Sequence, residues 1–280
     1  MLKTNYHSHS EFCDGTGKLE DYVKAAISKG FDVFGFSGHA PLPLKNDWAI
    51  TNNNLNLYLT EIERLKLLYR DRITLKTGLE IDFIEGLSGP GSKSFQNLNL
   101  DFIIGSVHLL KGKSDMDYLA VDYKKSEMDQ LISKGFGGNP KLLVKKYYSS
   151  IRKMSRLGGF DIIGHLDVIK KNNVDSIYFD ETEKWYKDEI KLTLQCIAEN
   201  NQIIEINTGQ VLKDPGKIYP SPWILRMAND QNIPVMINSD SHRTDRIDNF
   251  FGEAKTMILD AGYTKLKVLK GNKWEYDSII

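Results

Sequence analysis

Short apolar runs alternate with amphipathic segments along almost the whole chain, and this alternation constrains the fold more than any other feature. Each run is four to seven residues long, the length of a strand that is buried on both faces of a parallel sheet. The runs cover residues 3–7, 33–37, 74–80, 102–107, 161–164, 203–206 and 235–238. Strands that alternate with helices predict an α/β protein with a parallel sheet.

The segments between the runs have the spacing of helices that cover such a sheet. Apolar residues at i, i+3 and i+4 lie within 19–27, 62–69, 143–154 and 190–197. Gly30 is placed to end the first helix and Pro140 to begin the third. We interpret each apolar stripe as a surface packed on the sheet.

Seven strand and helix units in 280 residues predict one domain over residues 1–280 that forms a closed or nearly closed barrel. An open doubly wound sheet is the alternative. It is disfavoured because the first strand is followed by HSHSEFCDG and not by a glycine-rich phosphate-binding turn.

Composition excludes several classes of protein. Lys+Arg and Asp+Glu number 37 each, so the chain lacks the overall positive charge of a non-specific nucleic-acid binder. The polar amino terminus and the absence of a long apolar stretch predict a cytoplasmic protein with neither signal peptide nor membrane span. Cys13 and Cys196 are too few and too distant for a disulfide framework or a cysteine zinc site. The sequence carries no sign of the oligomeric state.

All six histidines lie at or just after the end of an apolar run. In a parallel barrel the carboxyl ends of the strands converge on one face, so these imidazoles are expected to form one site. His7 and His9 are two residues apart and project to the same side; Asp240 and His242 repeat this spacing. Nitrogen and carboxylate ligands without thiolate suit Zn²⁺, Mn²⁺ or Fe²⁺. One catalytic zinc uses about three protein ligands, so more than one metal is expected.

Six motifs, HSHSEFCDG, SGHAP, GLEIDF, GSVHLL, GHLDVIK and NSDSH, resemble the ordered motifs of the polymerase and histidinol phosphatase (PHP) superfamily. The first motif and the length are most similar to the monofunctional histidinol-phosphate phosphatases. This resemblance implies a distorted (β/α)7 TIM-like barrel with the metal site at the carboxyl ends of the strands. It also implies hydrolysis of L-histidinol phosphate to L-histidinol and phosphate, a step of histidine biosynthesis.

The resemblance further implies three divalent metal ions (Zn, Mn or Fe) and nine ligands. These are His7, His9, Glu80 and Asp240 at the first ion, the bridging Glu80 with His108 and His165 at the second, and Asp14, His39 and His242 at the third.

The expected reaction begins with attack on phosphorus by a hydroxide that bridges two metals, because coordination lowers the pKa of water. Asp240 either passes a proton to the leaving alkoxide or acts only as a ligand, and the sequence leaves both open. Arg243, Arg156 and Lys111 are candidate phosphate contacts, and for all three a solvated surface charge is an equal alternative.

Two long connections, 84–100 and 109–139, are expected to wall the substrate pocket or else to be surface insertions. In the second, Asp115, Asp117 and Asp122 are candidates for recognising an imidazole and an amine. The expected partner is therefore a small phosphomonoester, with no nucleic acid and no membrane. Protein-tyrosine phosphatase or nuclease activity on the same scaffold, and a metal-binding interaction module with little turnover, are the alternatives.

Overall fold

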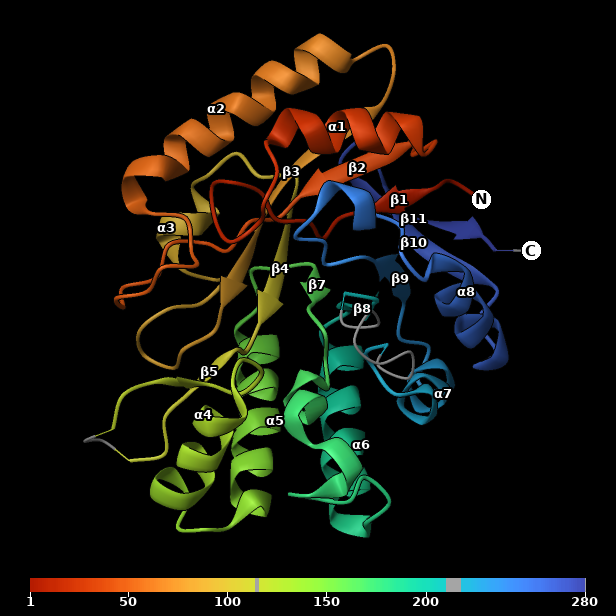
Figure 1. The fold of residues 1–280 in the computed structure, drawn as a ribbon. Helices are drawn as coiled ribbons and strands as arrows, with labels where there is room; N and C mark the ends of the chain where they lie inside the picture. Colours follow the sequence, from red (N-terminus) through yellow and green to blue (C-terminus); the bar gives the residue numbers. More distant parts are fainter. Residues whose placement is uncertain (114–115, 210–217, 280) are drawn as a thin grey trace.

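A computed structural model describes residues 1–113, 116–209 and 218–279 and confirms the predicted barrel. Each strand pairs in parallel with the next one in the sheet, and the spatial order follows the chain (Figure 1). The strands are β1 (Thr4–Asn5), β2 (Val33–Phe36), β3 (Thr74–Asp82), β4 (Phe102–Ser106), β7 (Ile162–Ile163), β8 (Ile203–Asn207) and β9 (Val235–Asn238).

Helices cover the outside of the sheet (Figure 1). They are α1 (Leu19–Ser28), α2 (Asn52–Tyr69), α5 (Pro140–Leu157), α6 (Lys184–Glu199), α7 (Pro222–Asp230) and α8 (Phe251–Asp260). The four predicted helices are α1, α2, α5 and α6, and their apolar stripes pack on the sheet, except that Leu68 of the α2 stripe is 56% exposed. Pro140 occupies the first turn of α5, where its missing N–H costs no hydrogen bond. Gly30 follows α1 with φ +71°, a conformation that favours glycine.

A carboxyl-terminal hairpin that the sequence did not predict closes the amino-terminal end of the barrel. It consists of the antiparallel strands β10 (Lys265–Lys270) and β11 (Lys273–Ser278). Leu269 packs in the barrel interior, and its N–H donates to the Tyr6 hydroxyl at 2.8 Å. Trp274 Nε1 donates to Asp161, which immediately precedes β7, at 2.9 Å. With this end filled, the opposite face, at the carboxyl ends of the strands, is left for the site.

Side chains close the seam between β1 and β9, where the ladder of backbone hydrogen bonds is missing. Tyr6 N–H donates to Asn238 Oδ1 at 2.8 Å, and Ser239 N–H donates to Asn5 Oδ1 at 2.9 Å. A parallel bridge between Ser8 and Ser241 continues the seam towards the carboxyl ends. The barrel is therefore nearly closed, as predicted, and asparagine amides replace backbone pairing at the junction.

Both long connections contain secondary structure. The first holds α3 (Lys93–Gln96), and the second holds β5 (Leu109–Leu110), β6 (Leu119–Ala120), α4 (Lys125–Gln130) and the π-helical η1 (Leu131–Gly135). Short 3₁₀ helices η2 (Val168–Asn172), η3 (Val174–Ser176) and η4 (Thr244–Arg246) follow β7 and β9. Among the helices of the described ranges, none has the length and apolar character needed to span a bilayer.

Candidate metal centre

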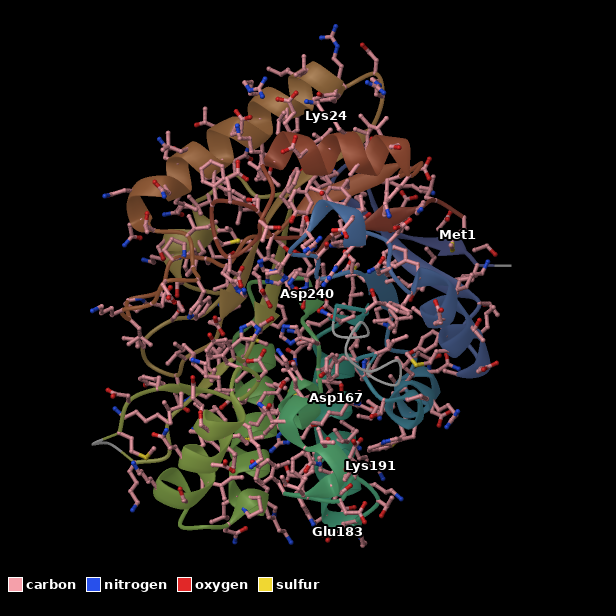
Figure 2. The ribbon with its side chains drawn as sticks, viewed as in Figure 1. Met1, Lys24, Asp167, Glu183, Lys191 and Asp240 are labelled. Atoms are coloured by element: carbon pink, nitrogen blue, oxygen red, sulfur yellow. The ribbon has the colours of Figure 1, made fainter. Side chains whose placement is uncertain are left out.

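Nine predicted ligands from separate parts of the chain meet at the carboxyl ends of the strands. Figure 2 shows Asp240 near the middle of the molecule, surrounded by the strands. His7, His9 and Asp14 follow β1, His39 follows β2, Glu80 lies in β3, His108 follows β4, His165 follows β7, and Asp240 and His242 follow β9. The barrel therefore brings together residues that are up to 235 positions apart, from His7 to His242.

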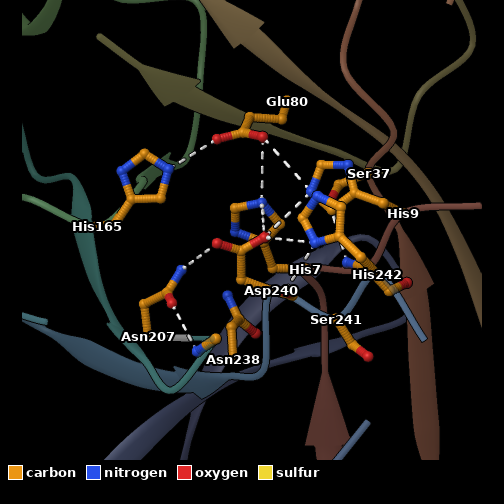
Figure 3. Close-up of polar contacts among 12 residues, drawn as sticks. His7, His9, Ser37, Glu80, His165, Asn207, Asn238, Asp240, Ser241 and His242 are labelled. Atoms are coloured by element: carbon orange, nitrogen blue, oxygen red, sulfur yellow. Dashed lines mark hydrogen bonds and ion pairs between the residues drawn. The ribbon is translucent and has the colours of Figure 1, made fainter. Parts of the chain in front are cut away.

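Glu80 lies at the centre of the cluster and is 2% exposed. Its Oε2 atom is 3.2 Å from His7 Nε2 (Figure 3). The same oxygen is 3.0 Å from His39 Nδ1. Its Oε1 atom is 3.0 Å from His165 Nε2 and accepts a hydrogen bond from Ser106 Oγ at 2.6 Å. Because its two oxygens face different imidazoles, this carboxylate is placed to bridge two cations.

Several buried atoms of the cluster lack a hydrogen-bond partner in the described structure: His7 Nε2, His9 Nε2, His39 Nδ1 and Glu80 Oε2. Leaving a polar atom buried and unsatisfied costs about 1–3 kcal/mol, so native proteins rarely do so without a reason. The three nitrogens lie 3.0–3.6 Å from Glu80 Oε2. A divalent cation between them would satisfy all four atoms, so the residues present fit a metal.

His108 and His165 form a second position on the other side of Glu80. Their Nε2 atoms are 3.0 Å apart. His108 Nδ1 is 2.9 Å from Asp82 Oδ1, which makes Nδ1 the protonated nitrogen and leaves the Nε2 lone pair free. His108 Nε2 faces the His165 ring, and it also faces Glu80 Oε1 at 3.5 Å. A cation between these three groups would stabilise this arrangement.

A third position surrounds Asp14, whose Oδ2 atom is 3.1 Å from His242 Nε2. Its Oδ1 atom is 3.6 Å from His9 Nδ1 and 3.8 Å from His39 Nε2. His9, Asp14, His39 and His242 can offer ligand atoms within 4.8 Å of one another, as can His39 with Glu80 and His108. The structure therefore places His39 between Glu80 and the third position, with Nδ1 towards Glu80 Oε2 and Nε2 towards Asp14.

Asp240 connects the first and third positions. Its Oδ1 atom is 3.2 Å from His9 Nε2, 3.4 Å from His7 Nε2 and 3.8 Å from His242 Nδ1, and Oδ2 accepts from Asn207 Nδ2 at 3.1 Å (Figure 3). Its backbone has φ +46°, a left-handed conformation that is costly for a residue with a side chain. We attribute this strain to the turn that directs both Asp240 and His242 into the cluster.

Two buried carboxylates outside the nine predicted ligands orient the imidazoles. Glu205, in β8, is 0% exposed and lies 2.9 Å from His7 Nδ1. It also accepts hydrogen bonds from Asn207, Asn238 and the backbone N–H of His165. Asp82 orients the ring of His108 in the same way, with its Oδ1 atom 2.9 Å from His108 Nδ1. Such carboxylates fix the ring and tautomer of metal-binding histidines.

The sequence contains a signal for both carboxylates. Glu205 is an acidic residue within the apolar run IIEIN, and Asp82 shares a strand face with Glu80 two residues earlier. An acid inside a buried strand requires a partner, because an unpaired buried charge is costly. The pattern alone does not identify that partner.

The electrostatics of the cluster favour positive charge. Burial would raise the pKa of Glu80, but His7, His39 and His108 hold it well below the usual range of a glutamate. Burial would lower the pKa of His7, but Glu205, Asp240 and Glu80 raise it well above 6.5. In the metal-free protein, a proton on His7 thus balances the carboxylates, whereas burial and the neighbouring His242 and His39 lower the pKa of His9 to about 3 and leave that ring neutral. Divalent ions would replace the proton on His7.

Residues 5–209 match the PHP domain family, which is most of the chain. The chain belongs to the PHP domain family. It is 30% identical over 259 residues to the histidinol-phosphatase of Bacillus subtilis, covering 87% of this chain and 94% of the relative. It is 28% identical over 264 residues to a Deinococcus radiodurans protein named "Probable histidinol-phosphatase", covering 91% and 92% of the two chains.

A solved relative has the fold of this PHP protein. The histidinol phosphate phosphatase of Lactococcus lactis, determined with zinc, L-histidinol and phosphate, is 22% identical. It covers 98% of each chain with a TM-score of 0.70. This likeness, together with the parallel strand order, confirms the (β/α)7 barrel that the sequence resemblance implied.

The three predicted phosphate contacts of this PHP protein lie in different places. Lys111 directly follows β5 on the face of the cluster, and its ammonium lies 5.2 Å from the centre of the Tyr118 ring. Arg243 follows His242, but its side chain is 53% exposed and pairs with Asp245 at 3.0 Å. Arg156 lies in the last turn of α5, which leads into the amino end of β7. It therefore sits at the opposite end of the barrel and does not join the cluster.

Proposed function

We propose that this PHP protein is a histidinol-phosphatase, a phosphoric monoester hydrolase that converts L-histidinol phosphate to L-histidinol and inorganic phosphate. The observation that carries the proposal is the convergence of buried, unsatisfied imidazole nitrogens on Glu80. Relatives that span nearly the whole chain and are named histidinol-phosphatases support the substrate. The L-histidinol and phosphate in the Lactococcus lactis structure support it further.

We assign three divalent ions, Zn, Mn or Fe, to the three positions around Glu80 and Asp14. His7, His9, Glu80 and Asp240 would hold the first, Glu80, His108 and His165 the second, and Asp14, His39 and His242 the third. When bound, such ions lower the pKa of coordinated water and neutralise phosphoryl oxygens, which supplies a nucleophile and stabilises charge in the transition state.

The chain's own groups would orient these ligands and move the proton. Glu205 and Asp82 hold His7 and His108 with Nδ1 protonated, so that each Nε2 faces the cluster. Burial would raise the pKa of Asp240, but His7, His9 and His242 hold it well below the usual range of an aspartate, so the group is ionised. Its side chain is 14% exposed, and it would pass a proton to the leaving alkoxide after taking that proton from the attacking water. Of the three basic candidates we favour Lys111 for a phosphoryl oxygen, because it lies three residues after His108. Arg243 would have to leave Asp245 to do so.

The deciding experiment measures turnover of histidinol phosphate, a phosphotyrosine peptide and single-stranded DNA after chelation and after return of Zn²⁺, Mn²⁺ or Fe²⁺. We expect turnover of histidinol phosphate that is lost on chelation and restored by metal. Turnover of the peptide or DNA in preference to histidinol phosphate would assign a different substrate. Metal binding without turnover of any of the three would make the protein an interaction module.

Replacing Asp240 with Asn separates its two roles. Loss of turnover with three metals still bound would assign the proton transfer to Asp240. Loss of metal would make it a ligand. Unchanged metal content with unchanged turnover would exclude the proton role.

A further inference from the structure

The second long connection brings one carboxylate, Asp122, to the wall beside His108. Strand β6 pairs with β5, so the chain folds back on the segment that follows His108. Val121 N–H then donates to the His108 carbonyl at 2.9 Å, and Asp122 is the next residue. The backbone thus fixes Asp122 next to one of the candidate ligands.

The element that follows His165 holds the other side of Asp122. Lys171, on η2, lies 3.6 Å from Asp122 Oδ2, and Asn172 Nδ2 donates to the Val121 carbonyl at 3.5 Å. Asp122 therefore lies between the segments that carry His108 and His165. Burial would raise the pKa of its carboxyl, but His108, Lys171 and His165 lower it below the usual value, so the group is ionised at neutral pH.

Asp122 differs from other carboxylates that follow the strand ends. The side chains of Glu85 and Asp245 are 45% and 61% exposed and pair with Lys146 and Arg243 at 3.2 and 3.0 Å. The Asp122 side chain is only 19% exposed, and its ion pair with Lys171 is longer. A partly desolvated carboxylate with a loose partner can exchange that partner for a cationic group of a ligand, at greater gain than an exposed one.

Of the three aspartates that the sequence left as candidates, the structure favours this one. Asp117 is exposed, and Asp115 lies outside the described residues. A phosphomonoester with its phosphate on the metal cluster projects its alcohol half against the surrounding wall, which includes the segment after His108. We propose that Asp122 determines substrate specificity by binding a positively charged nitrogen, amine or imidazolium, in the alcohol half of the phosphomonoester. This inference rests on the proposed function.

The test compares Asp122→Asn with the matched control Asp117→Asn, which removes the same charge from an exposed position of the same connection. Two substrates are used: histidinol phosphate, and p-nitrophenyl phosphate, which has neither amine nor imidazole. The inhibition constants of L-histidinol and of inorganic phosphate are measured in parallel. Thermal unfolding and metal content establish that each variant is folded and loaded, and Asp122→Glu restores the charge.

In Asp122→Asn we expect the ratio of kcat/KM for histidinol phosphate to that for p-nitrophenyl phosphate to fall by about 10-fold to 100-fold, mainly through KM. The inhibition constant of L-histidinol rises by a similar factor while that of phosphate stays near the wild-type value. Asp122→Glu recovers part of the selectivity, and Asp117→Asn retains all of it.

Two results overturn the inference in distinguishable ways. A wild-type selectivity ratio in Asp122→Asn, or an equal loss on both substrates, shows that Asp122 only supports the fold or His108. A wild-type protein that cleaves p-nitrophenyl phosphate but not histidinol phosphate overturns the proposed function, and this inference with it.

Discussion

Replacing Glu205 with Gln tests whether a buried carboxylate outside the ligand set controls the metal centre. Glu205 accepts from four donors: His7 Nδ1, which lies 2.9 and 3.1 Å from its two oxygens, and His165 N, Asn207 Nδ2 and Asn238 Nδ2 at 2.8–2.9 Å. Glutamine has the same shape but only one accepting oxygen, so at least one donor must face its amide group.

The magnitude follows from which oxygen is replaced. An amide nitrogen at Oε1 would face the donors of His165 and Asn207. At Oε2 it would face the donors of Asn238 and His7, and His7 Nδ1 would keep its 3.1 Å contact with Oε1. Asn238 cannot flip without losing its bond to Tyr6 N–H. The variant therefore loses one hydrogen bond to a charged group, and we expect the metal-free protein to be destabilised by about 1.5–3 kcal/mol.

The effect on metal binding should exceed the effect of lost stability alone. Glu205 holds His7 with Nδ1 protonated, and removing such an orienting carboxylate commonly costs about 10-fold to 100-fold in metal affinity or activity. Competitive chelator titration gives the metal affinity, and denaturant unfolding of the metal-free protein gives the stability. Activity is then measured at saturating metal.

Glu189→Gln is the control. Glu189 is also buried and pairs with Arg152 at 3.0 Å, but it lies on α6, away from the cluster. We expect this variant to lose stability and to keep wild-type metal affinity. Equal metal affinity in Glu205→Gln and wild type, or an equal loss in both variants, would refute the reasoning.

Three further predictions concern packing and protons. Gly164→Ala would place a Cβ 2.2 Å from Ser106 Oγ, which donates to Glu80, so we expect the metal content of this variant to fall. Gly252→Ala is its control: the added Cβ meets open space, so the free energy of unfolding in denaturant should stay the same or rise slightly. Leu269→Ala should destabilise the barrel by about 2–5 kcal/mol in the same assay with metal stoichiometry unchanged, and a lost metal would show that the hairpin reaches the site. Burial would lower the pKa of His242, but neighbouring carboxylates raise it to about 9, so the ring is protonated at pH 7 in the metal-free protein. Metal binding should therefore release protons, and the metal affinity should increase between pH 6.5 and 9. Calorimetry in two buffers measures the proton release, and its absence would contradict this prediction.

Local patterns in the sequence were sufficient to predict the barrel strands and to place the candidate metal ligands at one end of the barrel. A strand buried on both faces must be a short apolar run, and a helix packed on the sheet must carry apolar residues with the helical period. Both patterns can therefore be recognised in the sequence without knowing which element each one packs against. Because parallel strands have their carboxyl ends on one face, His108 and Glu80 could be assigned to one site before any contact was known. The short helices α7 and α8 and the hairpin β10–β11 were not predicted from these patterns.

Tertiary structure decided everything that depends on distant partners. Glu205 and His7 are 198 positions apart, and no local pattern indicates that they are in contact. A hydrogen bond between two strands depends on where the strands lie in the barrel and not on local spacing. The same holds for the amide of Asn238 that closes the seam and for Trp274, which fills the end of the barrel opposite the site. The chain determines which groups can bind metal, whereas the closed barrel determines which nitrogen of each imidazole faces the metal and which carboxylate holds it there.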